Sequence, residues 1–202
     1  MECIFCKKQA GFFKRYHENC KNSAENTMQQ IESLVNSHRN DDIVSKEVKM
    51  QIRNLAISND LYKNYLNARA INNKDIQKGE VIIHIESKLK ITETKRVCRM
   101  VETGYRYQKK PMWKEEEFLL DTSGKVIFTD KAIYLSVGIG TMRYPYKKIV
   151  NYGYNKMWIS RGAFFDIKTS SPFPHRFLIT DNFKRTEARK EQNITLFLHS
   201  LV

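Results

Sequence analysis

The chain has 202 residues, of which 41% are apolar and 11% aromatic, and it carries a formal net charge of +13 at pH 7. This composition is typical of a folded protein and argues against a disordered chain or a repeat array. The N-terminus has no signal-peptide apolar region, and no apolar run is long enough to cross a bilayer. We therefore expect a soluble, cytoplasmic protein.

The positive charge is concentrated in the last part of the sequence. Residues 81–202 contain 22 Lys and Arg against 12 Asp and Glu, whereas residues 25–80 contain eight of each kind. A basic segment favours anionic partners, such as nucleic acid, acidic lipid headgroups or an acidic protein surface. Charge alone does not choose among these three.

Three of the four cysteines and one histidine lie close to the N-terminus with the spacing C-x2-C-x10-H-x2-C, at Cys3, Cys6, His17 and Cys20. Two cysteines separated by two residues can bind one ion from a tight turn, and a pair at i and i+3 shares one face of a helical turn. The spacing predicts a structural zinc site, because four protein ligands leave no open position for water or substrate. The alternative is a set of buried free thiols beside a surface histidine.

This cluster resembles treble-clef-like zinc fingers, in which a knuckle pair is followed by a helical pair, over about residues 1–24. Four basic residues flank the ligands: Lys7, Lys8, Lys14 and Arg15. They are either solvated side chains that partly neutralise the thiolates or a patch for nucleic acid.

Apolar residues recur at helical spacing over residues 28–35, 44–55 and 61–68, which predicts two or three short helices. Thr27, with Gln30 three residues later, predicts a capping box, and Asp60 predicts an N-cap. The apolar stripes are narrow, so we expect these helices to pack against another surface. Residues 71–80 are interpreted as a connector, and we expect the domain boundary near residue 78.

From residue 79 the period changes from helical to two. Val81, Ile83 and Ile85 are apolar and alternate with His84 and Glu86, which predicts a half-buried antiparallel strand. Short β-like runs such as KRVCRMV, EEFLLD and KVIFT follow, separated by turn signals. An amphipathic helix is predicted near the C-terminus.

The runs GKVIFTDKAIYLSV, MRYPYKKIVNYGY and KMWISRGAFFDIKT, followed by a final helix, resemble the bacterial pleckstrin-homology-like domains, including the GRAM-like group. The positions that carry the resemblance are Gly124, Thr129, Asp130, Tyr134, Tyr144, Pro145, Ile149 and Val150. The resemblance covers about residues 80–202. It implies a non-enzymatic β-barrel that docks proteins, membranes or other ligands.

The expected fold class is therefore α+β: a small zinc finger and short helices, then a pleckstrin-homology-like antiparallel β-barrel capped by a C-terminal helix. The predicted domains are residues 1–24, residues 25–78 and residues 79–202. Cys98 lies in a strand-like run, and we interpret it as a core residue.

Two groups of residues are candidates for partner binding. Residues 105–114 are expected to form an exposed basic and aromatic loop, and a second group mixes basic residues with tyrosines. The candidates are Arg106, Lys109, Lys110, Trp113, Lys114, Arg143, Lys147 and Lys148. For the second group, the alternative is that the tyrosines fill a half-buried sheet face while the lysines are solvated.

The sequence gives little support for catalysis. Glu115, Glu116 and Glu117 are adjacent, so they alternate between faces of an extended chain, and no phosphate-binding glycine motif occurs. We expect a non-enzymatic adaptor with structural Zn²⁺ that docks a protein partner, without a small-molecule substrate. The alternatives are a sequence-independent nucleic-acid-binding protein and a protein that binds the surface of anionic membranes.

Overall fold

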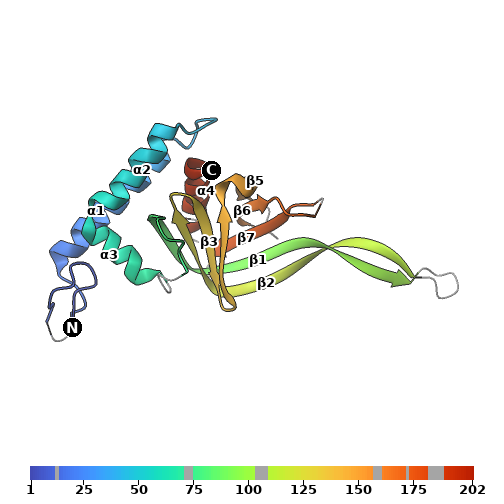
Figure 1. Ribbon diagram of the computed structural model, residues 1–202, viewed down its shortest axis with the longest axis horizontal. Coiled ribbons are helices and arrows are strands. Elements are labelled where there is room, and N and C mark those ends of the chain that lie inside the picture. Colours follow the sequence, from blue (N-terminus) through green and yellow to red (C-terminus); the bar gives the residue numbers. More distant parts are fainter. Residues whose placement is uncertain (12–13, 71–74, 103–108, 157–160, 172, 182–188) are drawn as a thin grey trace.

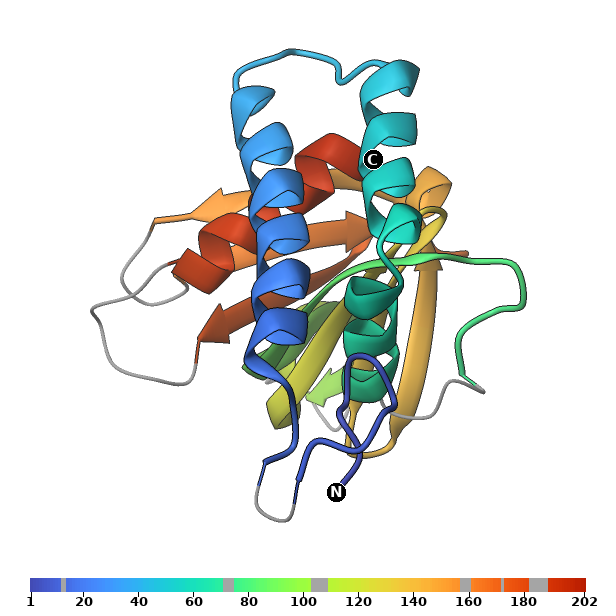
Figure 2. The ribbon, with the colours of Figure 1, turned by 90° about the vertical axis from the view of Figure 1, so that its left-hand side faces the viewer.

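The computed structural model describes the whole chain except residues 12–13, 71–74, 103–108, 157–160, 172 and 182–188. Within the described residues, three helices form a layer beside a curled antiparallel sheet, and a fourth helix lies between them (Figures 1 and 2). This architecture confirms the predicted α+β class. Among the described helices, none is both long and apolar enough to span a lipid bilayer.

The first three helices are α1 (Glu18–Ser37), α2 (Lys46–Ser58) and α3 (Asp60–Arg69), as the apolar spacing predicts. Each buries one narrow stripe; in α1 the stripe includes Ile31 and Val35. The expected capping box is wrong, because Thr27 lies buried in the middle of α1.

The N-cap of α3 is Asn59, one residue before the expected Asp60. The Asn59 side-chain oxygen accepts hydrogen bonds from the backbone N–H of Leu61 and Tyr62, at 3.0 and 3.3 Å. Its amide nitrogen donates to the hydroxyl oxygen of Thr27 at 2.7 Å. One side chain therefore caps α3 and also joins it to α1.

The described strands form one antiparallel sheet in the order β4-β3-β2-β1-β7-β6-β5. Their bounds are β1 (Ile82–Glu102), β2 (Lys109–Thr129), β3 (Ala132–Val137), β4 (Gly140–Pro145), β5 (Ile149–Asn155), β6 (Gly162–Ile167) and β7 (His175–Asp181). A short 3₁₀ turn, η1 (Tyr146–Lys148), joins β4 to β5. The strands and the C-terminal helix agree with the arrangement that the sequence resemblance implies.

The first two strands are far longer than predicted, with 21 residues each. The runs KRVCRMV and EEFLLD are parts of these strands, and they pair in one continuous register from Thr92↔Leu119 to Glu102↔Lys109. We call residues 93–102 and 109–118 the ribbon, and this ribbon extends well beyond the rest of the sheet (Figure 1). The expectation of a loop over residues 105–114 is wrong for residues 109–114, which lie in β2, whereas residues 105–108 lie outside the described residues.

The fourth helix, α4 (Arg189–Leu201), confirms the predicted C-terminal helix. It packs on β5, β6 and β7 on one side and on α1 and α2 on the other (Figure 2). His84, expected on the polar side of β1, is buried, and its ring stacks on Phe197 at 4.2 Å. The helices and the sheet thus share one continuous core.

The helical layer is also joined to the sheet by a buried hydrogen bond. The Tyr62 hydroxyl donates to the backbone carbonyl of Ile83 at 2.8 Å. Ile83 lies at a register shift between Ile82 and His84, where it has no paired residue in β2. A bulge of this kind leaves a backbone group available for another partner.

The variant Tyr62→Phe should therefore lose about 1 to 2 kcal/mol of unfolding free energy, because the Ile83 carbonyl remains buried without its donor. Urea denaturation followed by circular dichroism would measure this loss. Tyr65→Phe is the control, since the Tyr65 hydroxyl only accepts from Arg69 in a partly exposed position, and it should lose less. Equal stability of Tyr62→Phe and the parent protein would contradict this role of the hydroxyl.

Candidate metal centre and binding surfaces

The first pair of candidate ligands lies in a tight turn. Cys3 N–H donates to the Lys8 carbonyl at 2.8 Å, and Lys7 N–H donates to the Cys3 carbonyl at 2.9 Å. Lys7 has a positive φ of 61°, a left-handed conformation that a tight turn requires. Glu2 and Gln9 form a bridge that closes the turn, so the sulfurs of Cys3 and Cys6 face the same side.

The second pair comes from the start of α1. His17 is its N-cap residue, and Cys20 lies in its first turn. A backbone hydrogen bond of 3.0 Å, from Ile4 N–H to the Arg15 carbonyl, holds the chain before α1 against the first turn. This arrangement of a turn and a helix start is the one that the spacing predicts.

The ligand atoms of Cys3, Cys6, His17 and Cys20 all lie within 4.8 Å of one another. His17 Nδ1 is 3.3 Å from Cys6 Sγ and 3.8 Å from Cys20 Sγ. A tetrahedral ion with metal–sulfur bonds of about 2.3 Å and metal–nitrogen bonds of about 2.0 Å places its ligands roughly 3.5 to 3.8 Å apart. These four side chains can therefore hold a metal ion.

The remaining nitrogen of His17 is also bonded. Its Nε2 lies 3.1 Å from the carbonyl oxygen of Gln9. A histidine that binds a metal through one nitrogen usually donates from the other to such an acceptor, which fixes the ring orientation. Gln9 carries no signal in the sequence, because only its backbone takes part.

The electrostatics of the thiols also fit a bound cation. Burial raises the pKa of the Cys3 thiol, but backbone hydrogen bonds, led by that from Cys6, outweigh burial and lower the pKa to about 6. Burial and the nearby sulfurs of Cys6 and Cys3 raise the pKa of Cys20 to about 11. Three thiolates repel one another at this distance, and a divalent cation would offset that repulsion.

The arrangement can bind an ion but offers it no open position. All four donors of a tetrahedral site come from the protein, which is the composition of structural metal centres. Such a site fixes the N-terminal segment against α1.

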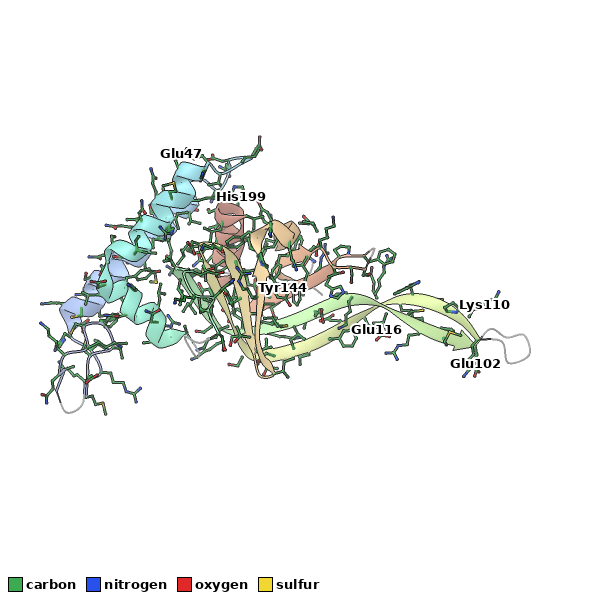
Figure 3. The ribbon with its side chains drawn as sticks, in the orientation of Figure 1. Glu47, Glu102, Lys110, Glu116, Tyr144 and His199 are labelled. Atoms are coloured by element: carbon green, nitrogen blue, oxygen red, sulfur yellow. The ribbon has the colours of Figure 1, made fainter. Side chains whose placement is uncertain are left out.

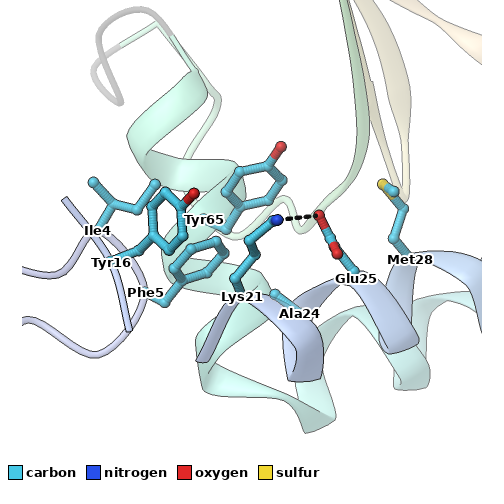
Figure 4. Close-up of a pocket in the computed structure, with 8 residues that line it drawn as sticks. All are labelled: Ile4, Phe5, Tyr16, Lys21, Ala24, Glu25, Met28 and Tyr65. Carbon is cyan, nitrogen blue, oxygen red and sulfur yellow. Dashed lines mark ion pairs between the residues drawn. The ribbon is translucent and has the colours of Figure 1, made fainter. Parts of the chain in front are cut away.

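A small pocket of about 140 Å³ lies beside the candidate metal centre (Figure 4). Phe5 stacks on Tyr65 of α3 at 5.1 Å and meets Tyr16 edge-on at 6.3 Å. Lys21 and Glu25 of α1 form an ion pair of 3.9 Å in its wall. The N-terminal segment therefore packs on the helices through aromatic rings as well as through the candidate metal ligands.

The first group of predicted partner-binding residues lies on the ribbon. Lys109, Lys110, Trp113 and Lys114 are exposed in β2, and Arg106 lies outside the described residues. Lys110 and Glu102 lie at the far end of the ribbon, with Glu116 nearer the sheet (Figure 3). The structure thus places four of the five residues on one projecting element.

The second predicted group is divided. The Arg143 guanidinium binds the Glu80 carboxylate, whose side chain is only 1% exposed, and its Nε also donates to the Tyr134 hydroxyl at 3.1 Å. Arg143 therefore anchors the connector to the sheet, whereas Lys147 and Lys148 are exposed in η1.

The expectation that Cys98 is a core residue is wrong. Cys98 is exposed on the ribbon, directly opposite Trp113, and Met100 lies opposite Pro111. Residues directly opposite on antiparallel strands point to the same face. These four side chains therefore form an exposed apolar patch, in which Met100 is 61% and Trp113 54% exposed.

Comparisons with known proteins identify no family for this chain. No protein-family model matches it, and no curated protein matches it. Among solved structures, the Vps36 N-terminal PH domain is similar over 61% of this chain and 82% of that chain, with 11% sequence identity and a TM-score of 0.35. A likeness this distant carries no argument about function.

Proposed function

We propose that this protein is a non-enzymatic intracellular adaptor, in which a zinc finger and a basic domain of the bacterial GRAM-like type serve to dock a protein partner. The observation that carries the proposal is the ribbon, which presents apolar and cationic side chains outside the core. Binding residues tend to lie on elements that project from a rigid scaffold. A four-ligand metal site without an open position supports a non-catalytic role.

Zinc is the metal that the donor set favours. Three thiolates and one imidazole in a tetrahedral arrangement suit Zn²⁺ better than Mg²⁺ or Ca²⁺, which prefer oxygen ligands. Free thiols in this number also suit a reducing compartment such as the cytoplasm. The zinc would stabilise the turn that contains Cys3 and its contact with α1.

A protein partner is favoured over nucleic acid by the charge of the ribbon. Its residues 93–102 and 109–118 carry six Lys and Arg against five Glu. Arg99 Nη2 lies 2.7 Å from Glu116, and Arg96 Nε lies 3.2 Å from Glu115. Phosphate binding depends on cations that are in excess, whereas a mixed surface with a central Trp and Met is typical of protein interfaces.

The first test concerns zinc. We expect the purified parent protein to contain one zinc ion per chain and Cys20→Ser to lose it during dialysis against a chelator, because a three-ligand site binds more weakly. Mass spectrometry of the metal content measures both. Cys98→Ser is the matched control and should keep its zinc, since Cys98 lies on the ribbon. Equal zinc content in Cys20→Ser and the parent would reject the site.

The second test concerns the partner. In pull-downs from nuclease-treated lysate, we expect the parent to retain a protein that Trp113→Ala binds at least roughly tenfold more weakly, because exposed aromatic anchors dominate binding energy. Quantitative mass spectrometry of the captured proteins makes the comparison. Ile139→Ala removes an apolar side chain that is 84% exposed on the β3–β4 turn and should bind as the parent does.

Two outcomes would contradict this proposal. If nuclease treatment removes every captured partner, the protein is a nucleic-acid-binding protein instead. If Trp113→Ala captures the same partners as the parent, the ribbon is not the docking surface.

A further inference from the structure

The outer part of the ribbon pairs with no third strand among the described residues, and it also contacts the Phe173 ring, which lies 4.0 Å from the Arg96 guanidinium and 6.3 Å from the Trp113 ring. β7 pairs with β1 only from Leu89 to Thr94, so residues 95–102 of β1 pair with β2 alone. An isolated two-stranded hairpin is marginally stable in water, and a free strand edge carries unpaired N–H and C=O groups. This part of β1 is thus suited to accept another strand.

The two edges of the ribbon differ in how they are protected. The edge of β2 contains Pro111, which has no N–H, and the exposed lysines Lys109, Lys110 and Lys114. Proline and lysine are the usual means by which proteins prevent strand addition at an edge. Residues 96–102 of β1 contain neither proline nor lysine and carry Val97, Cys98, Met100 and Val101 in sequence. The β1 edge is therefore the open one.

The sequence of this open edge is complementary to itself when it is read in the antiparallel direction. Around Arg99 as a centre, Arg96 is opposite Glu102, and Val97 is opposite Val101. Cys98 is opposite Met100 in the same alignment. Two copies paired in this register would gain two Arg–Glu pairs, two Val–Val pairs and two Cys–Met pairs, all of them favourable cross-strand neighbours.

The centre of this register brings Arg99 next to Arg99 of the second copy. Each Arg99 is already paired within its own chain with Glu116, through Nε and through Nη2 at 2.7 Å. The two Arg99 side chains would therefore meet with their charges already offset by the two Glu116 carboxylates. Arg96 donates from Nε to Glu115 in an exposed pair that stabilises little, and its guanidinium lies over the Phe173 ring at 4.0 Å. A second carboxylate would therefore approach the Nη groups of Arg96 in the plane of the guanidinium.

We propose that two copies of this chain pair through residues 96–102 of β1, antiparallel and centred on Arg99, to form a four-stranded sheet from the two ribbons. The pairing is two-fold symmetric, so it closes on itself and produces a dimer, not a fibre. Because the same face of each ribbon carries Cys98, Met100 and Trp113, the dimer joins both apolar patches into one surface. The β1 edge is used for pairing, and this face stays exposed.

A charge exchange tests the pairing. In Glu102→Arg, an arginine would meet Arg96 of the second copy, and in Arg96→Glu, a glutamate would meet Glu102 of the second copy. We expect each variant alone to dimerise at least roughly tenfold more weakly than the parent, because two opposite-charge pairs become like-charge pairs. An equimolar mixture of the two variants restores opposite charges at both positions and should dimerise as the parent does. Sedimentation velocity of the full chain with zinc, over a range of concentrations, measures the dimer fraction.

The matched control is Glu117→Arg, which makes the same charge change on β2 and should leave the dimer unchanged. The proposal is overturned if the parent stays monomeric at every concentration, or if the two variants dimerise as well as the parent. It is also overturned if their mixture shows no recovery. Partner capture by the parent is measured separately, so a monomeric parent that still loses its partner in Trp113→Ala would reject the dimer and keep the docking function.

Discussion

The architecture depends on β1, because this strand contacts both halves of the sheet and both groups of helices. β1 pairs with β2 along its length and with β7 from Leu89 to Thr94, so it joins the β1–β4 and β5–β7 halves of the sheet. At its start, the register shift around Ile83 frees a carbonyl that accepts from Tyr62 of α3. His84 of the same strand stacks on Phe197 of α4. A single strand thus positions both halves of the sheet and both groups of helices.

The sequence predicts well the elements whose buried residues recur at a regular spacing and the site whose candidate ligands have a fixed spacing. The three N-terminal helices, the C-terminal helix and the clustering of Cys3, Cys6, His17 and Cys20 belong here, since each leaves a repeated or paired pattern in the chain. The ribbon could not be predicted in the same way. Its strands have no buried face, so hydrophobic alternation does not identify them. The pattern therefore does not show that Cys98 is exposed or that Trp113 lies in a strand. The N-cap at Asn59 and the role of Gln9 depend on backbone geometry, which the residue types do not specify.

The N-terminal segment combines the four candidate metal ligands with aromatic contacts to the helices. A turn of this size buries few apolar side chains, of which Cys3 and Phe5 are the most enclosed. Small modules of this kind usually need a metal or a disulfide, because their own core is insufficient. Here Phe5 also packs on Tyr65 of α3, so apolar contact with the helical layer adds to the small core of the segment itself. The N-terminal segment is consequently continuous with the helices that support it.

The length of β1 and β2 has a mechanical consequence. The ribbon is not attached to the sheet by a hinge, because the same two strands continue from its far end into the core. A load applied to the far end along the strand direction is shared by both strands, and it acts in shear on the β1–β7 and β2–β3 ladders that hold them in the sheet. Hydrogen bonds loaded in shear must break together, whereas those loaded in peeling break one after another. The projecting element is therefore suited to transmit tension into the body of the protein without first unfolding.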